Sequence, residues 1–192
     1  MSKEELQIVN FLKENVVPLK DNFFGSFYRA SAYLTDGTYL PCVMFGNPNK
    51  LIKLASRRFA ETAQDEFNHR LVVESFVTNK STFPMYNVSK VERSPYAWPE
   101  EILRQIHGET TMGWTAFTAK MTDGKVFGFG TSFNFEFFDL PEGYTYEDIT
   151  EINSGMIVDS NGVERNFTPD WQVHYYRERP FFHCYTDLLP DG

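Results

Sequence analysis

Two histidines near one end of the sequence could act together on one ligand. His174 lies in the aromatic segment Trp171–Arg177, and His183 lies in the next segment, Phe181–Asp187. If these segments pair as a hairpin, the two imidazoles lie opposite each other on one face, where they could bind a metal or act as acid and base. Histidines in aromatic strands are more often packed and hydrogen-bonded, so we assign no metal and no catalytic residue from the sequence.

A second feature that could bind a ligand is the stretch KVFGFGTSFNFEFF at positions 125–138, with six phenylalanines and two glycines. Residues two apart share one face of a strand, so phenylalanines form a stripe along one face. Soluble proteins seldom expose such a stripe, and we therefore predict that it packs in the core. The stripe consists of Phe127, Phe129, Phe133, Phe135 and Phe137.

The opposite face of this predicted strand is small and polar. It carries Gly128, Gly130, Ser132, Asn134 and Glu136. Glycines inside a strand usually mark a bulge, a bend or a place where another backbone or a ligand comes close. Two interpretations follow: a curved sheet without a ligand, which is the more common use of such glycines, and a shallow ligand groove that would act together with His174 and His183.

Acidic and tyrosine residues are concentrated between positions 139 and 151. They are Asp139, Glu142, Tyr144, Tyr146, Glu147, Asp148 and Glu151. Carboxylates steer the encounter with a basic protein, and tyrosines supply contact area at a low entropy cost. Charged runs also commonly face water without binding anything, and this second interpretation stays open. The residue spacing differs from that of a calcium-binding loop.

Helical periodicity predicts about three helices that would support these sites. Ser2 and Glu5 have the spacing of a capping box, and apolar residues then recur at helical spacing as far as Pro18. A second helix is expected over positions 50–63, with basic residues on its outer side. A third begins at Pro99, where two glutamates follow in the first turn, and it stops at the next glycine along the chain.

Turn signals between strand-like segments predict antiparallel hairpins. Asp36-Gly37 lies within a hairpin over 27–45, and Asp123-Gly124 lies within another over 114–138. Asn161-Gly162 marks a further turn between two short strands. The predicted sheet is therefore built from local, antiparallel pairs.

Two of these segments resemble each other. Positions 27–37 (FYRASAYLTDG) and 114–124 (WTAFTAKMTDG) share an alanine and the Thr-Asp-Gly turn. An internal duplication would explain the match, and so would the general preference of hairpins for Asp-Gly turns. No low-complexity linker separates the halves. We therefore expect one α+β domain over 1–192, with the hairpins forming one curved sheet or two packed sheets that about three helices cover.

Composition narrows the functions that remain. A net charge of −8 and a pI near 5.0 argue against nonspecific contact with nucleic acid or an anionic membrane and mildly favour a basic partner. No segment approaches the roughly 20 consecutive apolar residues of a membrane helix. The opening residues lack a secretory pattern, and Cys42 and Cys184 have neither metal-binding nor disulfide spacing. We therefore expect a cytoplasmic protein.

The motifs of common enzyme classes are absent from the sequence. We therefore expect a non-catalytic binding protein, without a cofactor, that engages a basic protein through the acidic and tyrosine residues of 139–151. An inhibitor or immunity-type role would fit this expectation. The alternative is a small enzyme or small-molecule binder that uses the groove near Gly128 and Gly130 with the histidine pair. The sequence indicates no oligomeric state.

Overall fold

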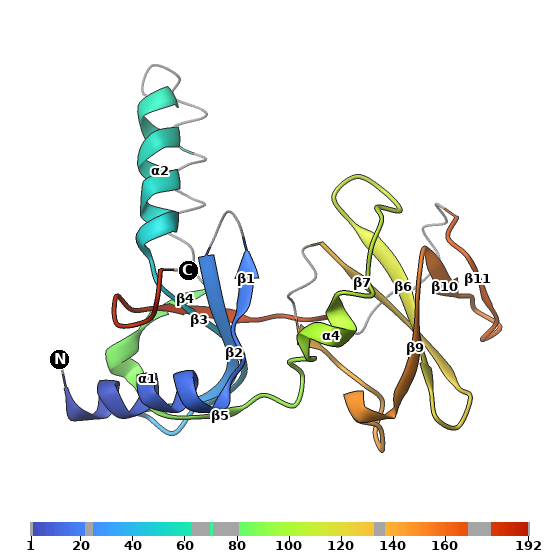
Figure 1. The fold of residues 1–192 in the computed structure, drawn as a ribbon, viewed down its shortest axis with the longest axis horizontal. Coiled ribbons are helices and arrows are strands. Elements are labelled where there is room, and N and C mark those ends of the chain that lie inside the picture. Colours follow the sequence, from blue (N-terminus) through green and yellow to red (C-terminus); the bar gives the residue numbers. More distant parts are fainter. Residues whose placement is uncertain are drawn as a thin grey trace. The chain divides into compact units, whose positions relative to one another are not determined.

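The computed structural model describes residues 2–21, 25–62, 70, 81–132, 137–168 and 178–191. The chain forms two compact units (Figure 1): unit 1 contains Met1–Ser94 and Phe181–Gly192, and unit 2 contains Pro95–Pro180. The predicted α+β class is confirmed, because helices occur together with mixed and antiparallel sheets. One domain over 1–192 stays a prediction. No helix in the described ranges has the length and apolar character needed to cross a membrane.

Unit 1 is built on a mixed six-stranded sheet. Its strands run in the order β1-β2-β3-β13-β4, and β5 also pairs with β2. The bounds are Leu19–Asp21 (β1), Gly25–Leu34 (β2), Tyr39–Gly46 (β3), Thr82–Pro84 (β4), Val88–Arg93 (β5) and Phe182–Tyr185 (β13). β2 and β3 form the predicted hairpin around Asp36-Gly37. Gly37 has a φ of 88° there, which glycine adopts without strain.

Strand β13 lies inside this sheet. It runs parallel to β3 on one side and to β4 on the other, so His183 lies between Met44 and Thr82. Because a strand has only two edges, β13 has no edge left for residues 171–177, and the predicted hairpin with His174 opposite His183 is wrong. His174 itself lies outside the described residues.

Helix α1 (Lys3–Asn15) packs on the core of unit 1. Ser2 Oγ accepts a hydrogen bond from Glu5 N at 3.1 Å, and Glu5 Oε2 accepts one from Ser2 N at 2.8 Å. The predicted capping box is therefore confirmed, and it satisfies amide groups that the helix itself leaves unbonded. The apolar side of the helix joins the main core of the unit through Ile8, Val9 and Leu12.

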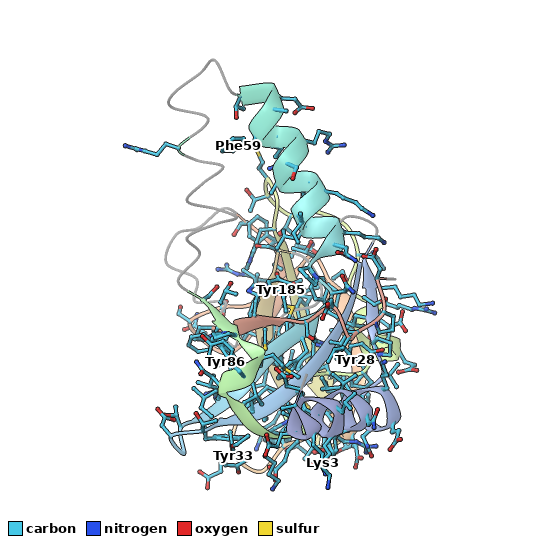
Figure 2. All side chains as sticks on the ribbon, turned by 90° about the vertical axis from the view of Figure 1, so that its left-hand side faces the viewer. Lys3, Tyr28, Tyr33, Phe59, Tyr86 and Tyr185 are labelled. Atoms are coloured by element: carbon cyan, nitrogen blue, oxygen red, sulfur yellow. The ribbon has the colours of Figure 1, made fainter. Side chains whose placement is uncertain are left out.

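Helix α2 (Asn49–Thr62) extends away from the sheet of unit 1 (Figures 1 and 2). It coincides closely with the helix predicted over 50–63. Among the described residues none of its side chains is buried, and Phe59 on the projecting part is 43% exposed (Figure 2). Helix α2 therefore adds nothing to the buried core described for unit 1.

Unit 2 contains smaller, antiparallel sheets. A three-stranded sheet has the order β7-β6-β9, and two-stranded sheets are formed by β10 with β11 and by β8 with β12. The bounds are Thr115–Met121 (β6), Val126–Thr131 (β7), Phe137–Phe138 (β8), Ile149–Ser154 (β9), Met156–Val158 (β10), Glu164–Asn166 (β11) and Glu178–Arg179 (β12). The turns predicted at Asp123-Gly124 and Asn161-Gly162 are confirmed. Helix α4 (Glu100–Leu103) is shorter than predicted.

Two of the five residues of the predicted phenylalanine stripe are buried in the core, Phe127 is half-buried, and the segment is divided between β7 and β8. Phe129 and Phe137 are buried, whereas Phe133 and Phe135 lie outside the described residues. Aromatic rings contact one another in this core at centroid distances of 4.8–6.1 Å. These rings belong to Trp98, Phe117, Phe129 and Phe138. Phe129 and Phe137 are therefore parts of the buried core of unit 2.

The two Asp-Gly hairpins are built alike. In unit 1, Asp36 Oδ1 accepts a hydrogen bond from Thr38 N at 2.9 Å, and in unit 2, Asp123 Oδ1 accepts one from Lys125 N at 3.0 Å. Thr38 and Lys125 therefore occupy the same place in the two turns. The turn tolerates either side chain, because the shared bond uses only the backbone of that residue.

A third strand joins each hairpin after a 3₁₀ turn, β5 in unit 1 and β9 in unit 2. The turns are Met85–Asn87 (η2) and Tyr146–Asp148 (η3). Thr35 N donates to Asn87 O at 2.8 Å, and Thr122 N donates to Asp148 O at 2.9 Å. The structural likeness thus extends beyond the matching segments 27–37 and 114–124. A common origin by duplication stays one of the two interpretations made from the sequence.

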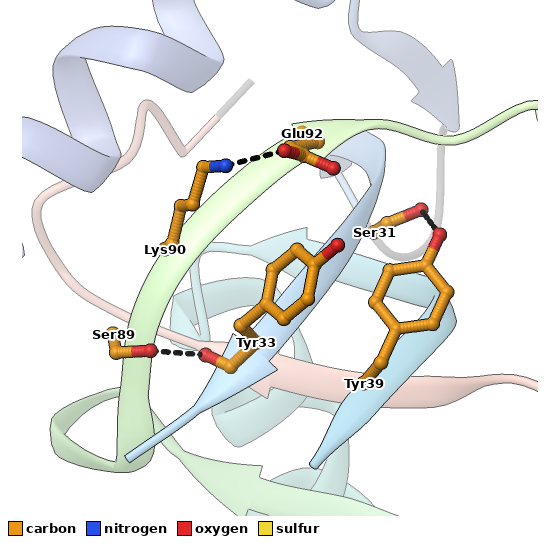
Figure 3. Close-up of polar contacts among 6 residues, drawn as sticks. All are labelled: Ser31, Tyr33, Tyr39, Ser89, Lys90 and Glu92. Atoms are coloured by element: carbon orange, nitrogen blue, oxygen red, sulfur yellow. Dashed lines mark hydrogen bonds and ion pairs between the residues drawn. The ribbon is translucent and has the colours of Figure 1, made fainter. Parts of the chain in front are cut away.

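A hydroxyl group ties the third strand to the central strand in both units. Ser89 Oγ donates to Tyr33 O at 3.0 Å in unit 1 (Figure 3), and Thr150 Oγ1 donates to Lys120 O at 3.0 Å in unit 2. Both bonds lie beside an irregularity in the strand pairing, between Tyr33 and Leu34 in unit 1 and between Lys120 and Met121 in unit 2. Each hydroxyl therefore supports the sheet where the backbone ladder is interrupted.

Ser89→Ala and Thr150→Val should each lower the free energy of unfolding by about 0.5–1 kcal/mol, because each removes one exposed hydroxyl group that donates to backbone carbonyls, to Tyr33 O and Leu34 O in the first case and to Lys120 O in the second. Urea unfolding of the full chain measures both losses. Ser160→Ala, which removes an exposed turn hydroxyl, is the control and should leave stability unchanged. A loss in only one of the two variants would show that the hairpins are stabilised differently.

Candidate functional site

The acidic and tyrosine residues predicted to bind a partner lie at the surface of unit 2. We call this set the acidic surface: Asp139, Glu142, Tyr144, Tyr146, Glu147, Asp148 and Glu151. They occupy the loop before η3, η3 itself and the first half of β9. The glutamates are exposed, and the other members are half-buried. The parts most accessible to a partner are therefore the three glutamate carboxylates.

Tyr144 is held by the turn between β6 and β7. Its hydroxyl donates to Asp123 Oδ2 at 2.6 Å and accepts from Lys125 Nζ at 2.8 Å, and its ring meets Phe127 edge-on at 5.2 Å. The hydrogen bond from Tyr144 is the main reason that the pKa of Asp123 lies below its usual value, and the backbone amide of Lys125 adds to it. Asp123 and Tyr144 are 21 positions apart, so no local sequence pattern connects them.

Other carboxylates of the acidic surface are used within unit 2. Asp148 Oδ2 accepts hydrogen bonds from Thr145 N at 2.8 Å and from Thr145 Oγ1 at 3.2 Å. Asp139 Oδ2 lies 3.2 Å from Arg179 Nη1, and the guanidinium carbon of Arg179 lies 4.0 Å from the centre of the Tyr96 ring. Asp139 and Asp148 therefore contribute to local structure, and their charge is partly compensated.

Glu142 and Glu147 differ from the rest of the acidic surface. Within the described ranges no ion pair involves either residue. Glu151 Oε2 lies 3.9 Å from Lys120 Nζ, a distance at which an exposed ion pair is weak. The acidic surface therefore presents uncompensated negative charge at Glu142 and Glu147.

The groove suggested by Gly128 and Gly130 is filled by side chains of the same unit. A Cβ atom at Gly130 would lie 1.7 Å from Trp114 Cζ2, and one at Gly128 would lie 3.5 Å from Val158 N. The indole of Trp114 thus packs directly on Gly130, while β10 covers Gly128. Ser132 is exposed, and Asn134 lies outside the described residues. The glycines therefore allow Trp114 and β10 to pack closely on β7 within unit 2.

His183 is enclosed by aromatic rings of unit 1. Its ring lies 5.7 Å from the ring of Tyr185, nearly parallel to it, and 5.2 Å from the ring of Phe181. His183 Nδ1 is buried and has no hydrogen-bond partner among the described residues. This burial lowers the pKa of His183, because the charged imidazolium would lose its hydration.

Cys184 projects to the other face of β13, where it is buried in the main core of unit 1. Its thiol donates to Met85 Sδ at 3.7 Å, and burial raises its pKa to about 12. A thiol with such a pKa is not a nucleophile at neutral pH. In the described part of the chain, no group of three or more His, Cys, Asp or Glu side chains could hold a metal ion.

Substituting alanine at each of the two glycines of β7 distinguishes the effect of a clash with Trp114 from the general effect of replacing a glycine in a strand. Gly130→Ala should lower the free energy of unfolding by about 1–3 kcal/mol, because Trp114 must move away. Gly128→Ala places its methyl group in ordinary contact with Val158 and should change stability by less than about 0.5 kcal/mol. Chemical unfolding, followed by the fluorescence of the tryptophans, measures both. Equal effects of the two substitutions would contradict the packing described here.

The pH dependence of stability tests the burial of His183. At pH values between its lowered pKa and 6.5, the unfolded chain binds a proton at this residue that the folded chain does not bind. The contribution of His183 to stability is therefore fully present above 6.5 and is lost as the pH falls through this interval. His183→Phe should remove this slope in urea unfolding, whereas substitution of the exposed His107 by Gln should leave it. An unchanged slope in the phenylalanine variant would rule out the effect.

Comparison of the chain with models of protein families, with curated proteins and with solved structures finds no match in any of the three. A function for this protein therefore has to be argued from the arrangement of its own residues.

Proposed function

We propose that the chain is a non-catalytic binding protein whose acidic surface engages a basic protein partner. The observation that carries the proposal is the exposure of Glu142 and Glu147, which make no ion pair among the described residues. Such charges attract a basic surface over a screening length of about 8–10 Å at physiological ionic strength. The net charge of −8 has the same sign and adds to this attraction.

The surroundings of these glutamates support the proposal, because they are already ordered. Tyr144 is held by Asp123 and packs against Phe127, and Asp148 closes η3 onto Thr145. A surface that is ordered before binding loses less conformational freedom when the partner arrives. Tyr144 and Tyr146 are half-buried, so their accessible edges would add apolar contact area beside the carboxylates.

An inhibitor or immunity-type role is one form of such binding, since an acidic protein can block the basic surface through which its partner functions. The alternative role, a small enzyme or small-molecule binder, has less support. Trp114 and Val158 occupy the space beside Gly130 and Gly128, and β13 pairs on both edges with strands of unit 1.

Charge reversal at the two glutamates tests the proposal. The full chain, immobilised and exposed to a lysate of its native host, should retain a basic protein at low salt and release it at high salt. The variant Glu142→Lys with Glu147→Lys should retain at most about a tenth as much, because two attractive contacts become repulsive. Quantitative mass spectrometry of the retained proteins measures the difference.

A matched control changes the same charge elsewhere. Glu14→Lys with Asp187→Lys reverses two exposed carboxylates of unit 1 and should retain the partner. If the wild-type chain retains no basic protein, or if both double variants lose it equally, the acidic surface is not the binding surface.

A further inference from the structure

Contacts between a cation, a tyrosine ring and a carboxylate recur among the described residues. The cation lies 5.4 Å from the ring centre in two of them and 4.0 Å in a third. They join Lys90 with Tyr33 and Glu92 (Figure 3), Lys125 with Tyr144 and Asp123, and Arg179 with Tyr96 and Asp139. In each of these contacts, a basic side chain lies close to both a tyrosine and a carboxylate.

The contact of Lys125 belongs to the acidic surface. Its ammonium nitrogen lies 2.8 Å from Tyr144 Oη and 3.4 Å from Asp123 Oδ2, while Phe127 packs against the Tyr144 ring. The side chains of Lys125 and Asp123 are 64% and 43% exposed. An ion pair this accessible is weak and exchanges readily with a competing cation.

The turn does not need a lysine at this position. The equivalent residue of unit 1 is Thr38, whose amide makes the same hydrogen bond to Asp36 that Lys125 makes to Asp123. The sequences of the two turns, Thr-Asp-Gly-Thr and Thr-Asp-Gly-Lys, differ only there. The contribution peculiar to Lys125 is therefore its contact with Tyr144 and Asp123.

We propose that Lys125 is an autoinhibitory contact of the acidic surface: its ammonium group occupies the Tyr144–Asp123 pair, which a lysine or arginine of the partner takes over on binding. This inference rests on the proposed function and specifies its chemistry. The partner supplies a basic side chain that displaces Lys125, while Glu142 and Glu147 attract the partner to the surface. The displaced Lys125 stays in water, so little is lost when it leaves.

A binding titration with a short oligolysine peptide at low salt tests this contact in the full chain. Lys125→Thr preserves the turn chemistry seen in unit 1 and should bind the peptide about two- to five-fold more tightly than the wild type. Lys120→Thr removes an equal charge from β6, where Lys120 faces Glu151 of β9. It should increase the affinity for the peptide less than Lys125→Thr does. Tyr144→Phe, added to Lys125→Thr, removes the hydroxyl group and should reduce the gain to that of Lys120→Thr. Thermal unfolding shows that each variant is folded, and Lys125→Gln replaces Lys125→Thr if that variant is not.

The outcomes separate this inference from the proposed function. If the wild type binds oligolysine and Lys125→Thr binds it no more tightly than Lys120→Thr, Lys125 is not autoinhibitory, although the acidic surface still binds basic chains. If neither the wild type nor Lys125→Thr binds oligolysine, both proposals are overturned. A gain in Lys125→Thr that Tyr144→Phe removes supports the displacement of Lys125 by the partner.

Discussion

The insertion of β13 between β3 and β4 is the contact on which unit 1 depends. It places residues from one end of the sequence in the middle of a sheet formed by the other end. Further backbone hydrogen bonds lie at the ends of these strands. His183 N donates to Ser81 O, just before β4, at 2.8 Å, and Thr186 N, just after β13, donates to Gly46 O at 2.9 Å. The buried Asn47 side chain then donates to Leu189 O at 2.7 Å. Unit 1 is therefore discontinuous in sequence, and the intervening residues form unit 2.

This insertion also decides what the chemically interesting residues of unit 1 can do. Interior parallel strands are normally covered on both faces, and His183 and Cys184 project to opposite faces of β13. Both side chains lose hydration there, which lowers the pKa of the histidine and raises that of the thiol. His183, one of the two histidines that the sequence suggested as acid and base, and the neighbouring Cys184 are therefore packed components of the fold.

The acidic surface has a different basis, because it lies on the framework of unit 2. Rings buried around Trp98 and the packing of Trp114 on Gly130 hold the sheet that carries β9 and the β6–β7 turn. That turn fixes Tyr144, while Glu142 and Glu147 stay exposed. A rigid base with exposed charge is a suitable arrangement for recognition, since the base limits the entropy lost on binding and the charge guides the encounter.

Features that depend on neighbouring residues were predictable from the sequence. The capping box at Ser2, the Asp-Gly turns and the burial of Phe129 and Phe137 all follow from spacings of a few residues, for which hydrogen-bonding geometry and strand periodicity are decisive. The concentration of acidic residues between positions 139 and 151 was equally evident, because it is a feature of the sequence itself.

Only the tertiary structure decided which distant segments meet. Periodicity identifies a strand without naming its neighbours, so the parallel placement of β13 could not be inferred, and a local hairpin was predicted in its place. The same reason applies to Trp114 on Gly130 and to Tyr144 between Asp123 and Lys125. Local turns and helix caps can be predicted from the sequence, because neighbouring residues form them. The packing of side chains such as Trp114 on Gly130, and the pairing of distant charged groups, depend on long-range contacts that form only when the whole chain folds.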